Sequence, residues 1–190
     1  MEPVVAMVIG GTRSGKSEIA EKLFMQWAGS GCNPAIYVAT GPAHIEGDEA
    51  WAERLAAHRA RRPSTWKTLE IDTIDELARQ LDIADAPVLV DSLTLIGASV
   101  DSCDNGLDSL VQALERRRRN GLLTVLVADE VGLSVHPAFP AGIAFQDQAG
   151  IVNSRVAAVC DSVLLAVAGW VVELSRPPGS SFRASEGSPQ

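Results

Sequence analysis

The chain has 190 residues, of which 46% are hydrophobic and 21% are charged. This length suits one compact domain with a sizeable core, and the composition excludes a fully disordered or fibrous chain. The 16 basic and 24 acidic residues give a formal charge of −8, which argues against non-specific nucleic-acid binding, because such binding depends on neutralising phosphates.

Short apolar segments alternate with helix-compatible segments along the chain. The expected strands are 4–9, 35–39, 88–90, 122–128 and 163–167, and the expected helices are 16–28, 48–61, 74–82, 107–119 and 147–160. Continuously apolar strands are typical of sheets buried on both faces, so we predict an α/β fold with a mostly parallel sheet flanked by helices. Residues 162–168 and 170–174 surround Gly169 and predict a hairpin at the sheet edge.

One domain is expected over 1–174, followed by a disordered tail over 175–190 that is rich in serine, proline and glycine. The first residues lack the basic segment of a signal peptide, and no apolar run is long enough to span a membrane. Cys32, Cys103 and Cys160 form no C-x-x-C pair, so we expect reduced thiols in a cytoplasmic protein.

The strongest motif follows the first expected strand and opens the first expected helix. It has the pattern G-x-x-x-x-G-K-[ST] and comprises Gly10, Gly11, Thr12, Arg13, Ser14, Gly15, Lys16 and Ser17. The glycines allow a tight turn whose N–H groups face a phosphate, and the helix N-terminus attracts the same anion. We expect Lys16 to act on the β- and γ-phosphates of ATP or GTP, and the Ser17 hydroxyl to bind Mg²⁺.

A carboxylate at the end of another buried strand is expected to complete the Mg²⁺ site. Asp91 directly follows the apolar run 86–90 and is the preferred candidate. Asp129 and Glu130, which follow 122–128, remain alternatives.

The expected helix 48–61 ends in basic residues before Pro63, and helical spacing brings His58 close to Arg54, Arg61 and Arg62. Nearby cations disfavour the imidazolium form and would stabilise a departing pyrophosphate, so His58 could attack the α-phosphate of a nucleotide. A histidine on a solvated helix end is the alternative. The arginine run 116–119 is expected to be a solvated helix face.

Seven segments carry motifs that are informative in combination. They are GGTRSGKS at 10–17, YVATG at 37–41, R-L-x-x-H-x-x-x-R-P at 54–63, W-x-x-x-E at 66–70, VLVDSLT at 88–94, EVG at 130–132 and F-x-D-x-x-G-x-x-N at 145–153. Together they resemble the bifunctional adenosylcobinamide kinase / adenosylcobinamide-phosphate guanylyltransferase family of cobalamin biosynthesis.

The resemblance implies two reactions on one corrinoid substrate. A nucleoside triphosphate first phosphorylates the aminopropanol hydroxyl of adenosylcobinamide, and GMP then passes from GTP to a histidine, here His58, and on to the phosphorylated corrinoid. The resemblance also implies a RecA-like phosphate-loop sheet, a homotrimer and a nucleotide site. That site would include Thr40, Gly41, Pro42, Arg59, Ala60, Arg61, Arg62, Pro63, Glu70 and Asp91.

The chain departs from the family pattern at three positions. Ile143 and Gln146 stand where the family has arginines, and Asp129 stands where it has asparagine. Two alternatives therefore stay open: a phosphate-loop kinase of another small molecule without guanylyl transfer, and a non-catalytic nucleotide-dependent switch.

Overall fold

The computed structural model describes residues 2–29, 34–40, 49, 53, 56, 59–97, 104–135 and 137–176. Within these residues seven strands form one sheet in the order β3-β2-β4-β5-β1-β6-β7. All neighbouring strands are parallel except β6 and β7, which pair in antiparallel fashion. The predicted α/β fold with a mostly parallel sheet flanked by helices is thus confirmed.

The strands and helices follow one another along the chain with short connections. The strands are β1 (Val5–Gly10), β2 (Ile36–Thr40), β3 (Lys67–Ile71), β4 (Val88–Asp91), β5 (Thr124–Asp129), β6 (Ser162–Val167) and β7 (Trp170–Glu173). The helices are α1 (Lys16–Ala28), α3 (Ile74–Ile83), α4 (Leu93–Gly97), α5 (Asp104–Arg119) and α6 (Pro140–Ala157). Every helix in the described part of the chain is too short or too polar to cross a bilayer.

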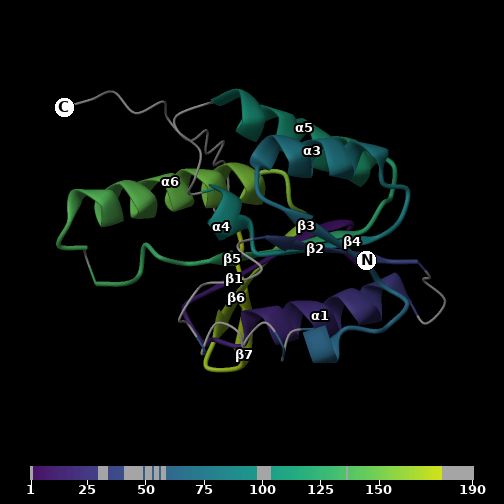
Figure 1. The fold of residues 1–190 in the computed structure, drawn as a ribbon, viewed down its shortest axis with the longest axis horizontal. Helices are drawn as coiled ribbons and strands as arrows, with labels where there is room; N and C mark the ends of the chain where they lie inside the picture. The colour runs from purple at the N-terminus through teal and green to yellow at the C-terminus, as the bar shows by residue number, and fades with distance from the viewer. Residues whose placement is uncertain are drawn as a thin grey trace.

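The sheet is covered on both faces, with α1 below it and α3, α5 and α6 above it in the view of Figure 1. Alternate side chains of β1 serve the two sides: Val5 and Met7 belong to the apolar cluster with α3 and α5, whereas Ala6 and Val8 belong to the cluster with α1. This two-sided burial explains why the strand reads as a continuous apolar run.

Most predicted elements are confirmed to within three residues at either end, including the hairpin of β6 and β7. The sequence prediction missed β3, because this edge strand is short and its side chains are mostly exposed. It also missed the short helix α4 and started α6 seven residues late. In α6 the side chains of Phe145 and Ile151 are exposed, so the apolar periodicity that reveals a helix is weak there.

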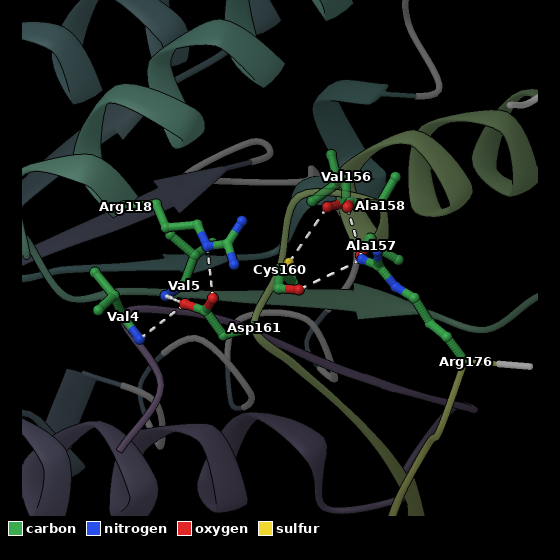
Figure 2. A network of polar contacts seen from close by, with 9 residues as sticks. All are labelled: Val4, Val5, Arg118, Val156, Ala157, Ala158, Cys160, Asp161 and Arg176. Atoms are coloured by element: carbon green, nitrogen blue, oxygen red, sulfur yellow. Dashed lines mark hydrogen bonds and ion pairs between the residues drawn. The ribbon is translucent and has the colours of Figure 1, made fainter. Parts of the chain in front are cut away.

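Asp161, between α6 and β6, joins three parts of the chain (Figure 2). Its carboxylate accepts hydrogen bonds from the backbone N–H groups of Val4 and Val5 at 3.1 and 3.0 Å, and it pairs with Arg118 at 2.5 Å. Partial burial raises the pKa of Asp161, but the hydrogen bonds from Val5, Arg118 and Val4 lower it further, so its net pKa lies below the ordinary value. These contacts fix the start of β1, and with it the approach to the loop that follows.

The neighbouring end of α6 is closed by a cation. Arg176 donates hydrogen bonds to the carbonyls of Ala157 and Ala158 at 2.7 and 2.6 Å, as Figure 2 shows. Cys160 is a free, buried cysteine, and burial raises the pKa of its thiol to about 12, as expected for an inert thiol. Of the predicted tail 175–190, only Ser175 and Arg176 are described; Cys32 and Cys103 also lie outside the described residues.

The expectation of a solvated arginine face at the end of α5 is wrong for one residue, Arg117. Its side chain is buried and donates five hydrogen bonds of 2.6 to 3.3 Å. The acceptors are the Thr124 hydroxyl and the carbonyls of Leu81, Ala84, Ala86 and Leu123. Burial lowers the pKa of Arg117 to about 10, which still leaves it charged at neutral pH. This arginine therefore joins the end of α3 to the beginnings of β4 and β5.

Replacing Arg117 with alanine should lower the free energy of unfolding by about 4 kcal/mol, because several buried acceptors lose their donors at once. Arg116→Ala is the matched control, since Arg116 pairs with Asp82 on an exposed surface and its loss should cost less than about 1 kcal/mol. Urea unfolding of the two variants measures the difference. Equal midpoints would contradict the structural role of Arg117.

Candidate active site

The candidate site lies where the carboxyl ends of β1, β2, β4 and β5 meet. These four strands are parallel, so their last residues lie along one edge of the sheet. Gly10 is in register with Asp129, and Ala39 is in register with Asp91. Ligands of open parallel sheets bind outside this edge, which makes it the expected position for a nucleotide.

The turn between β1 and α1 has the backbone that the motif predicts. Gly15 has a φ of +88°, which a side chain would strain, and its carbonyl accepts the first helical hydrogen bond from Ile19 at 3.0 Å. A Cβ on Gly10 would lie 2.5 Å from the Ala166 carbonyl oxygen. Both glycines are therefore required by geometry at their positions.

The hairpin of β6 and β7 supports the phosphate loop from outside. The Gly169 N–H donates to the Ser14 carbonyl at 2.9 Å. The Ser14 hydroxyl is buried and has no hydrogen-bond partner within the described part of the chain. An unpartnered polar group inside the loop is consistent with a polar ligand there.

Lys16 is the first residue of α1, and its ammonium group forms an ion pair with Asp129 at 2.6 Å. The same group donates to the Gly11 carbonyl at 3.3 Å. Asp129 is itself held on both sides: its N–H donates to the Thr94 hydroxyl at 2.6 Å, and its carbonyl accepts from the Asn153 side chain at 3.0 Å. Asp129 is therefore the partner of the phosphate-loop lysine.

Asp91 lies beside Ser17, as the preferred interpretation of the sequence expected. The Ser17 hydroxyl donates to one oxygen of the Asp91 carboxylate at 3.3 Å, and the Tyr37 hydroxyl donates to the other at 2.8 Å. A hydroxyl and a carboxylate are hard oxygen ligands, so these residues fit Mg²⁺, whose remaining ligands in such sites are phosphate oxygens and water. Apart from them, the described residues hold no group of three or more His, Cys, Asp or Glu side chains suited to a metal.

Thr40 is buried at the end of β2 and reaches the residue after Asp91. Its hydroxyl accepts from the Ser92 N–H at 2.9 Å and donates to the Ser92 carbonyl. Thr40 therefore fixes the backbone next to Asp91. The neighbours Gly41 and Pro42, which were expected at the nucleotide, lie outside the described residues.

His58 and Arg54 also lie outside the described residues, but the end of their predicted helix is described. Residues 49, 53, 56 and 59–61 are helical, and Ala60 is exposed. Arg59 pairs with Glu70 on β3 at 3.4 Å, and Arg61 pairs with the buried carboxylate of Glu21 on α1 at 2.9 Å. Two of the expected cations are thus partly neutralised by acidic partners.

Arg62 faces an aromatic ring rather than a carboxylate. Its guanidinium carbon lies 3.4 Å from the centre of the Tyr37 ring. The loop after it is held by the Trp66 N–H, which donates to the Pro63 carbonyl at 3.0 Å. The Trp66 ring stacks on Tyr37 at 6.4 Å and meets Phe24 of α1 edge-on at 5.1 Å.

Sequence reasoning missed several residues that the structure brings to the site: Tyr37, Glu21, Thr94 and Asn153. Tyr37 could have been noticed as the single tyrosine of the chain, placed in a buried strand one motif away from Asp91. The contacts of Thr94 and Asn153 depend on tertiary packing and leave no local signal.

Gln146 of α6, which stands where the family has an arginine, binds the loop after β5. Its amide donates to the Val131 carbonyl at 2.5 Å and lies 3.4 Å from the Ser134 hydroxyl. Its described contacts therefore hold a loop and carry no charge to the site.

A glycine-rich turn between a buried strand and a helix, with its lysine, its serine and a carboxylate from a neighbouring strand, defines a phosphate-loop nucleotide-binding protein of the α/β class. The chain matches the family model described as cobinamide kinase / cobinamide phosphate guanyltransferase over residues 6–174. It therefore belongs to this family.

Curated relatives agree with that assignment. The bifunctional adenosylcobalamin biosynthesis protein CobP of Pseudomonas aeruginosa is 36% identical over 176 residues, which cover 90% of this chain and 98% of the relative. CobU of Salmonella typhimurium and CobU of Escherichia coli, both named as bifunctional adenosylcobalamin biosynthesis proteins, are 30% and 29% identical over 188 residues, with 90% of this chain and 99% of each relative covered. Among solved structures, a KaiC-like protein of Pyrococcus horikoshii is similar with a TM-score of 0.48 and 14% identity, over 85% of this chain and 70% of that one.

Proposed function

We propose that this protein phosphorylates adenosylcobinamide with a nucleoside triphosphate and then transfers GMP from GTP to the product, giving adenosylcobinamide-GDP. Family membership over residues 6–174 supports the pair of activities. The observation that carries the proposal in this chain is the gathering of Lys16, Ser17 and Asp91 around the phosphate loop.

In the kinase reaction the phosphate loop binds the β- and γ-phosphates, and Lys16 exchanges Asp129 for phosphate oxygens. Mg²⁺, held by Ser17 and Asp91, would neutralise charge on the phosphates. An oxygen of the aminopropanol group then bonds to the γ-phosphorus while the bond to the β-phosphate oxygen breaks. The protein contributes mainly position and charge, which suits the loose transition state of phosphoryl transfer.

In the guanylyl transfer a nitrogen of the His58 imidazole attacks the α-phosphorus of GTP, and pyrophosphate leaves with the bonding electron pair. The resulting phosphoramidate is reactive, so a terminal oxygen of the corrinoid phosphate displaces the histidine and takes GMP. We assign supporting roles at the nucleotide to Thr40, Glu70 and the segment 59–63. Their positions at the carboxyl ends of β2 and β3, and in the loop that leads to β3, support this.

The test is conversion of adenosylcobinamide by the purified protein with Mg²⁺, using ATP or GTP alone and then both together. Mass spectrometry should show adenosylcobinamide phosphate first and adenosylcobinamide-GDP once GTP is present. Nucleotide hydrolysis that ignores the corrinoid would favour the switch interpretation. Phosphorylation without GDP-corrinoid would favour a kinase alone.

We further propose a cytoplasmic homotrimer, as the family resemblance implies. Four apolar side chains of the edge hairpin, Val167, Trp170, Val172 and Leu174, are 43 to 80% exposed, which supports burial against another copy. Light scattering should give about three times the 20.1 kDa chain mass, and Trp170→Asp should shift the protein toward the monomer. A monomeric wild type at the assay concentration would contradict the trimer.

A further inference from the structure

Tyr37 joins two parts of the site that are far apart in the sequence. Its side chain is buried in β2, with 1% of its surface exposed. The hydroxyl donates to one oxygen of Asp91 at 2.8 Å, and the other oxygen of Asp91 accepts from Ser17 at 3.3 Å. With one oxygen held by Tyr37, the Asp91 carboxylate is turned so that its other oxygen faces the phosphate loop.

The phenol is suited to act as a permanent donor. Burial and the adjacent Asp91 carboxylate raise the pKa of Tyr37 well above its ordinary value, so the hydroxyl keeps its proton at any pH at which the protein is folded. A carboxylate oxygen that already accepts this strong hydrogen bond is not free to rotate away from Ser17.

The ring of the same tyrosine holds the other part of the site. The guanidinium of Arg62 lies 3.4 Å from the ring centre, a cation–π distance, and Arg62 comes four residues after His58. The adjacent Arg61 is bound to Glu21 of α1. One side chain therefore contacts both the Mg²⁺-binding carboxylate and the segment that directly follows the proposed nucleophile.

We propose that Tyr37 is a positioning residue for both half-reactions: its hydroxyl orients Asp91 toward the metal–nucleotide complex, and its ring fixes Arg62 and thereby the chain next to His58. This inference rests on the proposed function, in which Asp91 binds Mg²⁺ and His58 accepts GMP. Packing alone does not explain the arrangement, because a phenylalanine would fill the same space between Arg62 and Trp66 without the hydroxyl contact to Asp91.

Tyr37→Phe tests the hydroxyl, since it keeps the ring. Mn²⁺ replaces Mg²⁺ as a probe, and its binding to the protein–GTP complex is followed by electron paramagnetic resonance. The variant should bind Mn²⁺ roughly tenfold more weakly, as expected for the loss of one charge-assisted hydrogen bond, while GTP affinity in the presence of a chelator stays unchanged. Trp66→Phe is the control: it disturbs the same aromatic cluster, does not touch Asp91 and should leave Mn²⁺ binding unchanged.

Arg62→Met tests the ring contact, since it leaves the bond between Tyr37 and Asp91 in place. It should slow the attachment of labelled GMP to the protein about tenfold without weakening Mn²⁺ binding. Mn²⁺ affinity of Tyr37→Phe within twofold of wild type would overturn the role of the hydroxyl, and an unchanged labelling rate in Arg62→Met would overturn the role of the ring. A wild type that binds Mn²⁺–GTP but never acquires label would instead refute the proposed guanylyl transfer, and the Mn²⁺ comparison would still decide the first role.

Discussion

A His58→Ala variant should lose guanylyl transfer by more than about 1000-fold and keep the kinase reaction, so that adenosylcobinamide phosphate accumulates. The reason is chemical: alanine offers no nucleophile for the α-phosphate, whereas the γ-phosphoryl transfer uses Lys16, Ser17 and Asp91 at the phosphate loop. Chromatography of the corrinoid products from ATP and GTP measures both steps in one assay.

The chain provides its own controls, because it contains only two other histidines, His44 and His136. Substitution of either with alanine should leave GMP attachment intact. If His58→Ala still forms the GDP-corrinoid at the wild-type rate, GMP passes directly from GTP to the acceptor or through another residue. If both activities vanish together, His58 is needed for more than the covalent step.

The Lys16→Met variant should lower the kcat of the kinase reaction roughly 100- to 1000-fold, because it removes the cation that stabilises charge developing on the transferred phosphoryl group. Methionine keeps most of the aliphatic length of the lysine side chain. Steady-state rates with adenosylcobinamide and ATP measure the effect.

The ion pair with Asp129 requires one further control for this substitution. Removing Lys16 leaves the Asp129 carboxylate without the partner it has at 2.6 Å, and this charge could itself repel the nucleotide. The double variant Lys16→Met/Asp129→Asn removes that charge. We expect it to stay as inactive as the single variant; recovery to near the wild-type rate would show that repulsion by Asp129, rather than loss of the cation, caused the defect.

The parallel strands and the phosphate loop were predictable because their signals are local. Each buried strand is a continuous apolar run, and the loop has glycines where the backbone turns tightly, as the φ of Gly15 confirms. The strand β3 escaped prediction because an exposed edge strand of five residues has neither a long apolar run nor a sustained alternation.

The pairing of charges was much harder to predict. Arg61 and Arg62 were expected to surround His58 as cations, yet Arg61 pairs with Glu21, forty positions earlier, and Arg62 lies on the ring of Tyr37. Arg117 looked like one of four solvated arginines, although it is the one that points inward. Such contacts depend on which helix face meets the sheet, and neighbouring residues in the sequence do not encode this.

The central claim is that this chain carries GMP on His58, and one labelling experiment tests it most directly. GTP labelled at the α-phosphate is incubated with Mg²⁺ and the purified protein, which is then denatured and digested. The account predicts label that resists alkali, is lost in acid and is recovered on the peptide containing His58, as a histidine phosphoramidate requires. A protein that binds GTP and retains no label after denaturation would contradict it.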